Sequence, residues 1–398
     1  MRTVTDRERR ARLARRHGLA PEHRYADVGT ATQAMTVWHA TEAATVHLAL
    51  HARVDGLRID DVEHALYEDR SLVKHLAMRR TLFAFPRDLL PAAMGSASAR
   101  VAAQEGKNLH KWLTAGGVVE EQDAWLRDAY AATLAALADG VPRTSTQLRD
   151  LVPALDLRFR MGSPGKKWGG EFPIGRWVIG TLAAQGHLMR ANNLGHWRLN
   201  KPAWTVTESW LGDTPVPLTA AEGYAELVRR WLWTFGPGTE TDLVWWLGST
   251  KSAVRAALAT IGAVQVGLEG GGTGWVLPDD PIATDPEPET EPWAALVPTL
   301  DPTVMGWKER GFYLDGEDVA YLFDSNGNAG NTAWWDGRIV GAWAQDQEGQ
   351  VHPIVRHDIG EDGTRALKAE AERLTQWLDG VVIVNVYKSR QMKEAKLP

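Results

Sequence analysis

The stretch VWHATEAATVHLALHARV, residues 37–54, places three side chains capable of proton or water chemistry inside an apolar helical run. His39 carries an imidazole whose ordinary pKa lies near neutrality, so its neutral ring can accept a proton from water at physiological pH. Thr41 offers a hydroxyl that can orient such a water molecule, and Glu42 can steady either the imidazole or a nearby positive charge. The set has the residue types that a water-activating site needs. The alternative is that these residues only cap or solvate a helix turn.

Composition removes several other kinds of chemistry. The 398 residues contain no cysteine, which excludes a disulfide framework, a thiolate nucleophile and a Cys-ligated metal centre. His47 and His51 stand four apart on one helical face, but no HExxH pattern accompanies them, and we expect them to be packed rather than to bind a metal. No apolar run is long enough for a membrane span and the N-terminus has no apolar centre, so we expect a cytoplasmic protein.

The charge of the chain is uneven. Residues 1–200 contain 28 Lys and Arg against 21 Asp and Glu, whereas residues 201–398 contain 16 against 29. A basic half beside an acidic half indicates that one half faces a polyanion; the alternative is uneven solvated charge. The clearest basic segment is RFRMGSPGKKWGG, where glycines let the backbone approach a phosphate. We expect phosphate contacts from its cations and from the arginines that follow: Arg158, Arg160, Lys166, Lys167, Arg176, Arg190 and Arg198.

One order of elements recurs along residues 1–280. Helical stretches are followed by paired β-forming runs, and this occurs about three times. The paired runs are LVKHLAMRRTLFAFP, HLMRANNLGHWRLN and VQVGLEGGGTGWVLP. Three helices followed by a two-stranded ribbon make up the winged-helix form of helix-turn-helix. The sequence predicts three such units, at residues 1–95, 96–215 and 216–280, although weak identity between them leaves a coincidence of pattern as the alternative.

The remainder of the chain predicts a fourth unit. PDDPIATDPEPETEPW, residues 278–293, is rich in proline and acids and is typical of a linker or a long surface loop. Beyond it, GFYLDGEDVAYLF, NTAWWDGRIVGAWAQ and QVHPIVRH predict strands, and GTRALKAEAERLTQWLDG predicts a helix. We expect a curled sheet or β-barrel closed by one helix at residues 281–398, which makes the fold α+β overall.

Four segments in this order resemble the tandem winged-helix DNA glycosylases of the AlkZ/YcaQ family: LVKHLAMRRTLFAFP, GPGTETDLVWWLG, VPTLDPTVMGWKER and DGRIVGAWA. The resemblance covers nearly the whole chain. It implies three tandem winged-helix motifs that form a C-shaped, DNA-facing channel, followed by a C-terminal β-barrel. It also implies hydrolysis of the N-glycosidic bond of bulky alkylated purines or crosslinked nucleotides, with no metal and no nucleotide cofactor.

The resemblance places the opening stretch at the water site. In that family a Gln-hydrophobic-Gln or Gln-hydrophobic-Asp triplet holds the catalytic water ahead of an apolar helix that ends in an arginine. Here Arg53 matches the arginine and HAT, residues 39–41, matches the triplet, with Glu42 following. This match predicts His39, Thr41 and Glu42 as catalytic residues. A rival match, QAM at residues 33–35, keeps the glutamine of Gln33 but lies too far from Arg53.

A second departure lies in MRRTLFAFP, where Arg80 replaces a glycine of the family pattern and Phe83 replaces a histidine. Arg79 and Arg80 of this motif, together with Arg53, are predicted DNA contacts. The prediction is a monomer that binds duplex DNA and acts as a monofunctional glycosylase, whose rate falls on the acid side near the ordinary imidazole pKa. The alternative hypotheses are a non-catalytic winged-helix protein that kept the channel and a transcriptional regulator that reads one operator.

Overall fold

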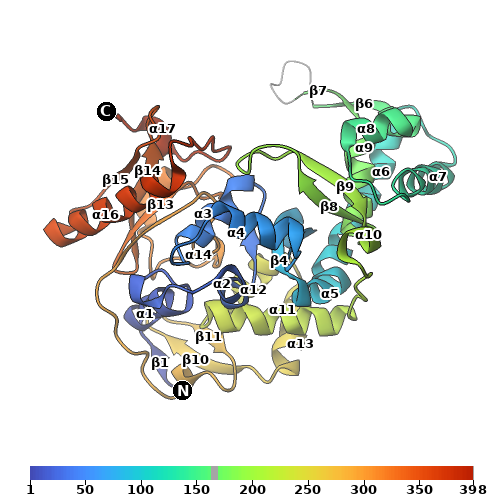
Figure 1. Ribbon diagram of the computed structural model, residues 1–398. Helices are drawn as coiled ribbons and strands as arrows, with labels where there is room; N and C mark the ends of the chain where they lie inside the picture. Colours follow the sequence, from blue (N-terminus) through green and yellow to red (C-terminus); the bar gives the residue numbers. More distant parts are fainter. Residues whose placement is uncertain (163–168, 398) are drawn as a thin grey trace.

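The computed structural model describes residues 1–162 and 169–397, and its elements fall into three hairpin units and a C-terminal unit (Figure 1). The first unit follows β1 (Thr3–Val4) and α1 (Asp6–Arg16). It comprises α2 (Val28–Met35), β2 (Trp38–His39), α3 (Ala43–His51), α4 (Ile59–Glu63), β3 (Leu72–Ala77) and β4 (Thr81–Pro86). The predicted pair LVKHLAMRRTLFAFP is confirmed as the antiparallel hairpin β3–β4, and β2 joins it in the order β2-β4-β3.

The second unit contains the most helices and its own apolar core. Its elements are α5 (Leu90–Ala93), α6 (Ala99–Ala115), α7 (Gln122–Ala135), β5 (Arg143–Thr144), α8 (Ser145–Leu151), β6 (Arg158–Met161), β7 (Gly170–Pro173), α9 (Gly175–Ala184), β8 (Leu188–Asn193), β9 (Pro202–Val206) and α10 (Thr207–Leu211). The core gathers residues from Leu109 to Trp204, separate from the core of the first unit. Strand β5 joins the β8–β9 hairpin in the order β5-β9-β8.

The third unit repeats the order of three helices and a hairpin. Its elements are α11 (Ala220–Phe235), α12 (Glu240–Leu247), α13 (Lys251–Thr260), β10 (Val264–Leu268) and β11 (Thr273–Val276). Each helix begins at a threonine whose hydroxyl accepts a backbone N–H of the first turn, which explains why the three starts are readable in the sequence. Strand β1 adds to this hairpin in parallel, so the N-terminus is part of the third sheet.

The C-terminal unit is an open sheet, and the predicted closed barrel is not found in the described residues. Its elements are β12 (Ala294–Val297), α14 (Pro302–Met305), α15 (Val319–Leu322), β13 (Thr332–Trp335), β14 (Arg338–Gln345), β15 (Val351–Val355), α16 (Gly360–Leu378) and α17 (Arg390–Glu394). The four strands lie in the order β12-β13-β14-β15, and α16 packs its apolar face on them. GFYLDGEDVAYLF, predicted as a strand, forms helical turns and α15 instead.

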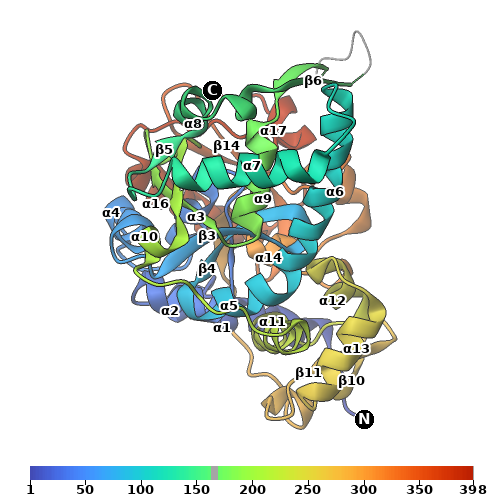
Figure 2. The same cartoon turned by 90° about the vertical axis from the view of Figure 1, so that its right-hand side faces the viewer.

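The cores do not follow the four predicted boundaries one by one. A single cluster joins side chains of the first unit, such as Trp38, to side chains of the third, such as Trp231, and to Trp334 of the C-terminal sheet. Figure 2 shows the second unit, with α7 and α9, over one half of the molecule and α13 with β10 and β11 at the opposite end. The division at residues 95, 215 and 280 therefore stays a prediction. None of the described helices has the length and apolarity that crossing a bilayer requires.

The turn region of the β8–β9 hairpin connects three units. Trp197 is buried there, with its ring 4.9 Å from the ring of His47 in α3 and 5.8 Å from the ring of Trp377 in α16. The indole of Trp377 in turn donates to the backbone carbonyl of Leu57 at 2.7 Å. The hairpin therefore packs across the first unit and the C-terminal helix.

Candidate active site and nucleic-acid interface

His39 lies in β2, directly opposite Phe83 of β4, and its ring packs edge-on against that phenyl ring at 5.3 Å. Only 6% of its surface is exposed, and its Nδ1 atom is buried without a hydrogen-bond partner in the described residues. Burial, reinforced by the charge of Arg79, lowers the pKa of His39 to about 3. The imidazole is therefore neutral at pH 7 but is a much weaker base than an ordinary histidine.

Thr41 follows β2 in the turn before α3 and lines a cavity of about 310 Å³, here called the Thr41 pocket. Its other lining residues are Leu76, Arg80, Leu82, Glu105, Arg176, Trp177, Gly180, Arg190 and Asn200. Neither His39 nor Glu42 belongs to this lining. Of the three predicted catalytic residues, only Thr41 lines this pocket, together with three arginines.

Glu42 is buried at the start of α3 and is engaged by the segment before α17. Its Oε1 atom accepts the backbone N–H of Val386 at 2.7 Å and of Tyr387 at 2.9 Å, and Oε2 accepts from Asn385 Nδ2 at 3.3 Å. Burial raises the pKa of Glu42, and these hydrogen bonds oppose that effect. The carboxylate is thus held by residues 385–387 and makes no hydrogen bond to His39, so of its two predicted roles the structure does not support the steadying of the imidazole, and the role beside a positive charge stays a prediction.

Arg53 is fully buried, which corrects the prediction that it contacts DNA. Its guanidinium forms a two-fold ion pair with Asp301, with Nη2 2.6 Å from Oδ1 and Nη1 2.8 Å from Oδ2. It also donates to the hydroxyl of Thr303 and to the carbonyl of Ala49, both at 2.8 Å. Because a DNA phosphate cannot reach this group, Arg53 connects α3 to the start of α14 instead.

Arg79 and Arg80 form the tip of the β3–β4 hairpin, and both adopt left-handed backbone conformations, with φ values of 53° and 58°. Non-glycine residues in this region cost about 1 kcal/mol or more and persist where surrounding contacts hold them. The guanidinium of Arg79 stacks over Trp245 at 3.9 Å, beside Gly248, where an added Cβ would come within 3.0 Å of Arg79. Desolvation lowers the pKa of Arg79 to about 10, so it stays charged at neutral pH.

Arg80 binds Glu105 of α6 through two hydrogen bonds, of 2.7 Å from Nε and 2.9 Å from Nη2. This ion pair lines the Thr41 pocket and also a neighbouring cavity of about 420 Å³, here called the Arg79 pocket. The exposed cations of the Arg79 pocket are Arg79, Arg80, Arg100 and Lys107, and Glu105 is its single acid. Four cations around one buried acid favour binding of phosphates.

The predicted cations of the second unit fall into two groups. Arg176 and Arg190 line the Thr41 pocket, where Arg176 stacks over Trp177 at 3.8 Å and Arg190 donates to Asn200 at 3.2 Å. Burial lowers the pKa of Arg190 to about 10. Arg158 and Arg160 are exposed on β6 and line neither pocket, and Arg158 pairs with Asp156 at 3.2 Å. Arg198 is half-buried in the β8–β9 turn region. Lys166 and Lys167 lie outside the described residues.

The rival match is less favourable in the structure. Gln33 is exposed on α2, donates to Asp88 at 3.1 Å and accepts from Arg230. It lines neither the Thr41 pocket nor the Arg79 pocket. Gln33 is therefore part of a surface polar cluster rather than a wall of the candidate site.

Sequence reasoning missed Glu105, Asn200 and a half-buried pair, Lys74 and Tyr67, near the Thr41 pocket. Lys74 donates to the hydroxyl of Tyr67 at 2.8 Å, and burial lowers the pKa of Lys74 to about 8. Both line a narrow recess that shares Leu82, Arg190 and Asn200 with the Thr41 pocket. The one available signal was the isolation of Glu105 as the only acid between residues 89 and 119.

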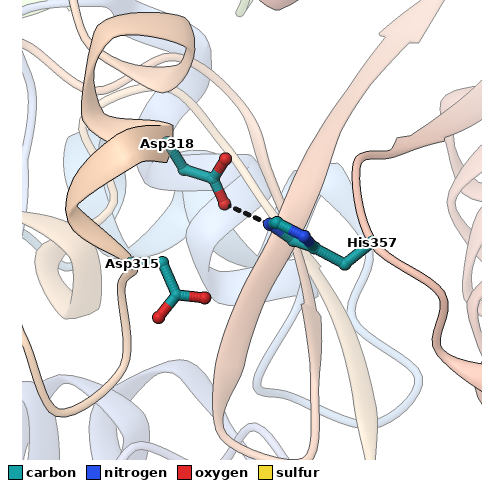
Figure 3. A group of neighbouring side chains, drawn as sticks. All are labelled: Asp315, Asp318 and His357. Carbon is teal, nitrogen blue, oxygen red and sulfur yellow. Dashed lines mark hydrogen bonds and ion pairs between the residues drawn. The ribbon is translucent and has the colours of Figure 1, made fainter.

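Asp315, Asp318 and His357 of the C-terminal unit come close enough together to share a cation (Figure 3). Asp318 is buried and accepts from His357 Nε2 and from Arg356 Nε, both at 2.5 Å, while Arg338 pairs with Asp315 at 3.1 Å. Two arginines thus balance two carboxylates, which leaves no excess negative charge to attract a metal. The cluster is explained as a structural ion-pair network.

The Thr41 pocket thus lies between the first and second hairpin units, and three arginines line it beside the half-buried Thr41. The family model for AlkZ-like DNA glycosylases matches residues 32–377, and the chain belongs to this family. It is similar over its length to Streptomyces sahachiroi DNA glycosylase AlkZ, with a TM-score of 0.73 and 21% identity, covering 97% of this chain and 100% of that chain. At this identity the likeness shows the fold. None of the curated proteins matches the chain in sequence.

Proposed function

We propose that the protein binds duplex DNA across the Thr41 and Arg79 pockets and releases bulky alkylated purines or crosslinked nucleotides by hydrolysing the N-glycosidic bond. Membership of the AlkZ-like DNA glycosylase family supports the reaction. The observation that carries the assignment is the position of Thr41 in a pocket lined by Arg80, Arg176 and Arg190. These cations suit a phosphate backbone that presents one nucleotide to the hydroxyl.

The reaction needs one positioned water molecule. An N3- or N7-alkylated purine carries a positive charge, so it leaves with the bonding electron pair and becomes neutral without a general acid. Water then adds to the oxocarbenium-like C1′ carbon and loses a proton to an acceptor. Thr41 can hold this water, and the neutral imidazole of His39, whose low pKa makes it a weak base, is the candidate acceptor of the proton. This route uses neither a metal nor a nucleotide cofactor.

We also infer that the three hairpin units are winged helices that together present a C-shaped channel. Each unit contains helices followed by an antiparallel hairpin, and in each sheet a two-residue strand joins that hairpin: β2, β5 and β1. A hairpin of this kind can contact a DNA backbone. In the second unit, however, the buried ring of Trp197 packs on α3 and α16, so this hairpin also connects units.

The alternative is a DNA-binding protein without excision activity, or one that reads a single operator. It is favoured by the burial of His39, which replaces the first polar residue of the family triplet and does not line the Thr41 pocket. The test is release of base from duplex carrying N7-alkylguanine by the monomeric protein. Release would support the glycosylase, whereas salt-sensitive binding without release would favour the non-catalytic protein. Selection of one palindrome from random duplex would favour the regulator.

A further inference from the structure

The segment between α16 and α17, residues 383–388, alternates between anchored and exposed side chains, and we call it the C-terminal segment. Ile383 is buried and its backbone N–H donates to Gln345 Oε1 at 2.9 Å. Asn385 donates to Thr299 Oγ1 at 3.0 Å. Between and beyond these anchors, Val384 is 69% exposed and Val386 is 76% exposed. Two β-branched apolar side chains are thus held outward on a fixed backbone.

The C-terminal segment is hydrogen-bonded to a residue beside the candidate site. The backbone N–H groups of Val386 and Tyr387 donate to Glu42, which is adjacent in sequence to Thr41. Figure 1 shows this dark red stretch beside the start of α3. Lys388 is also exposed, so the outward face ends in a cation. The exposed valines therefore project from a backbone that is bound to the residue following Thr41, which lines the Thr41 pocket.

We propose that Val384 and Val386 enter the base stack of the bound duplex, beside the nucleotide that turns out into the Thr41 pocket. This inference rests on the proposed function. Removing a nucleotide from the stack leaves an apolar gap, and proteins that bend or open duplex DNA fill such gaps with apolar side chains. The exposed valines supply the apolar surface, and Glu42 fixes the backbone from which they project. Glu42 is thereby a positioning residue for the valines.

The double substitution Val384→Ser with Val386→Ser tests this proposal, and Val216→Ser is the matched control. Val216 is 80% exposed and lies in the connection between α10 and α11. The probe is a duplex in which fluorescent 2-aminopurine neighbours a stable abasic analogue. We expect wild-type protein and the control to raise its fluorescence on binding, and the double variant to lose more than half of that rise. A variant carrying isoleucine at both positions should keep it.

Excision supplies the second readout. The double variant should release N7-alkylguanine from fully paired duplex roughly ten- to a hundredfold more slowly, because the unstacked state is less stabilised. From a substrate with no base opposite the lesion the difference should shrink. If wild-type protein raises the fluorescence but releases no base, the proposed function fails, whereas the insertion of Val384 and Val386 into the base stack is still supported. If the double variant shows the fluorescence rise and the excision rate of the wild type, the proposed insertion of the valines is overturned, and the proposed function is not affected. If the wild-type protein is a dimer and the double variant is a monomer, the valines form a contact between two copies of the chain, and this result also overturns the proposed insertion.

Discussion

Arg80 and Glu105 form an ion pair that belongs to the walls of two neighbouring pockets at once. The carboxylate is only 5% exposed, the guanidinium is 59% exposed, and two hydrogen bonds of 2.7 and 2.9 Å join them. Asn108 adds a third hydrogen bond to Glu105 at 3.1 Å. A cation held in this way has a fixed orientation at the two pockets and is partly neutralised.

Replacing Glu105 by Gln should release the charge of Arg80 for phosphate contact. We expect Glu105→Gln to raise affinity for undamaged duplex at low salt, and to steepen the dependence of log affinity on log salt by up to about one unit, since each phosphate contact releases counterions. Arg80→Ala should weaken binding and flatten the slope by a similar amount. Fluorescence anisotropy over a salt series measures both. A Glu105→Gln slope equal to that of the wild type would mean that Arg80 does not contact DNA.

Arg53 should contribute to stability and not to DNA binding. Arg53→Met leaves the carboxylate of Asp301 buried without its partner, and removal of one member of a buried pair costs about 3–5 kcal/mol of unfolding free energy. Urea unfolding measures this loss. The control is Arg58→Met, since Arg58 is exposed and its ion pair is with Asp61, three residues further along the chain. A folded Arg53→Met protein whose salt slope for DNA is flattened would restore the predicted DNA contact.

Three buried histidines should make the protein less stable in acid. Burial lowers the pKa of His39 and His17 to about 3 and that of His75 to about 4. Between about pH 6 and pH 4 the unfolded chain protonates these rings and the folded protein does not, so the unfolded state binds more protons. The unfolding free energy should therefore fall as pH falls, by up to about 1.4 kcal/mol per pH unit for each histidine.

Urea unfolding between pH 4.5 and 7.5 measures how the unfolding free energy depends on pH. His39→Gln should reduce this slope by up to about 1.4 kcal/mol per pH unit, the contribution of one histidine. The same pKa of about 3 replaces the expectation that excision falls near the ordinary imidazole pKa. Excision should show no acid limb near pH 6.5 that belongs to His39. An acid limb at that pH in the wild type, absent from His39→Gln, would show that the ring is accessible and basic in the DNA complex.

Thr41 should affect excision more than binding. Thr41→Ala removes one hydrogen bond to the proposed water, a loss of about 1 kcal/mol, and should slow single-turnover excision by roughly five- to tenfold. Thr41→Ser keeps the hydroxyl and should retain most of the rate. Affinity for duplex should change little in either variant, because Thr41 carries no charge. Equal rates for all three proteins would remove Thr41 from the water site.

Local sequence signals predicted much of the fold. The helices of the third unit begin at Thr219, Thr239 and Thr250, whose capping chemistry is visible in the sequence. The strand predicted across residues 311–323 was wrong, because its apolar residues suit a short helix as well as a strand, and its acids begin helical turns there. Closure of a barrel depends on which strands pair at long range, and this leaves no local signal.

The sequence named the cations of the candidate site but not their arrangement or burial. Arg80, Arg176 and Arg190 come together at the Thr41 pocket, and their predicted contact with DNA stays a prediction. Arg53 has the same residue type but faces Asp301, a partner 248 positions away, and sequence spacing cannot reveal such a pair. The low pKa of His39 likewise arises from tertiary packing around β2.

The packing of Trp197 between α3 and α16 has a consequence for the energetics of DNA capture. These contacts join parts of the chain that are far apart in sequence, and they are made entirely between residues of the protein. The relative orientation of the second unit is thus set during folding, and the associated loss of configurational entropy does not recur when duplex arrives. Because DNA binding does not have to order the second unit against the others, this preorganisation keeps the entropic penalty of association small.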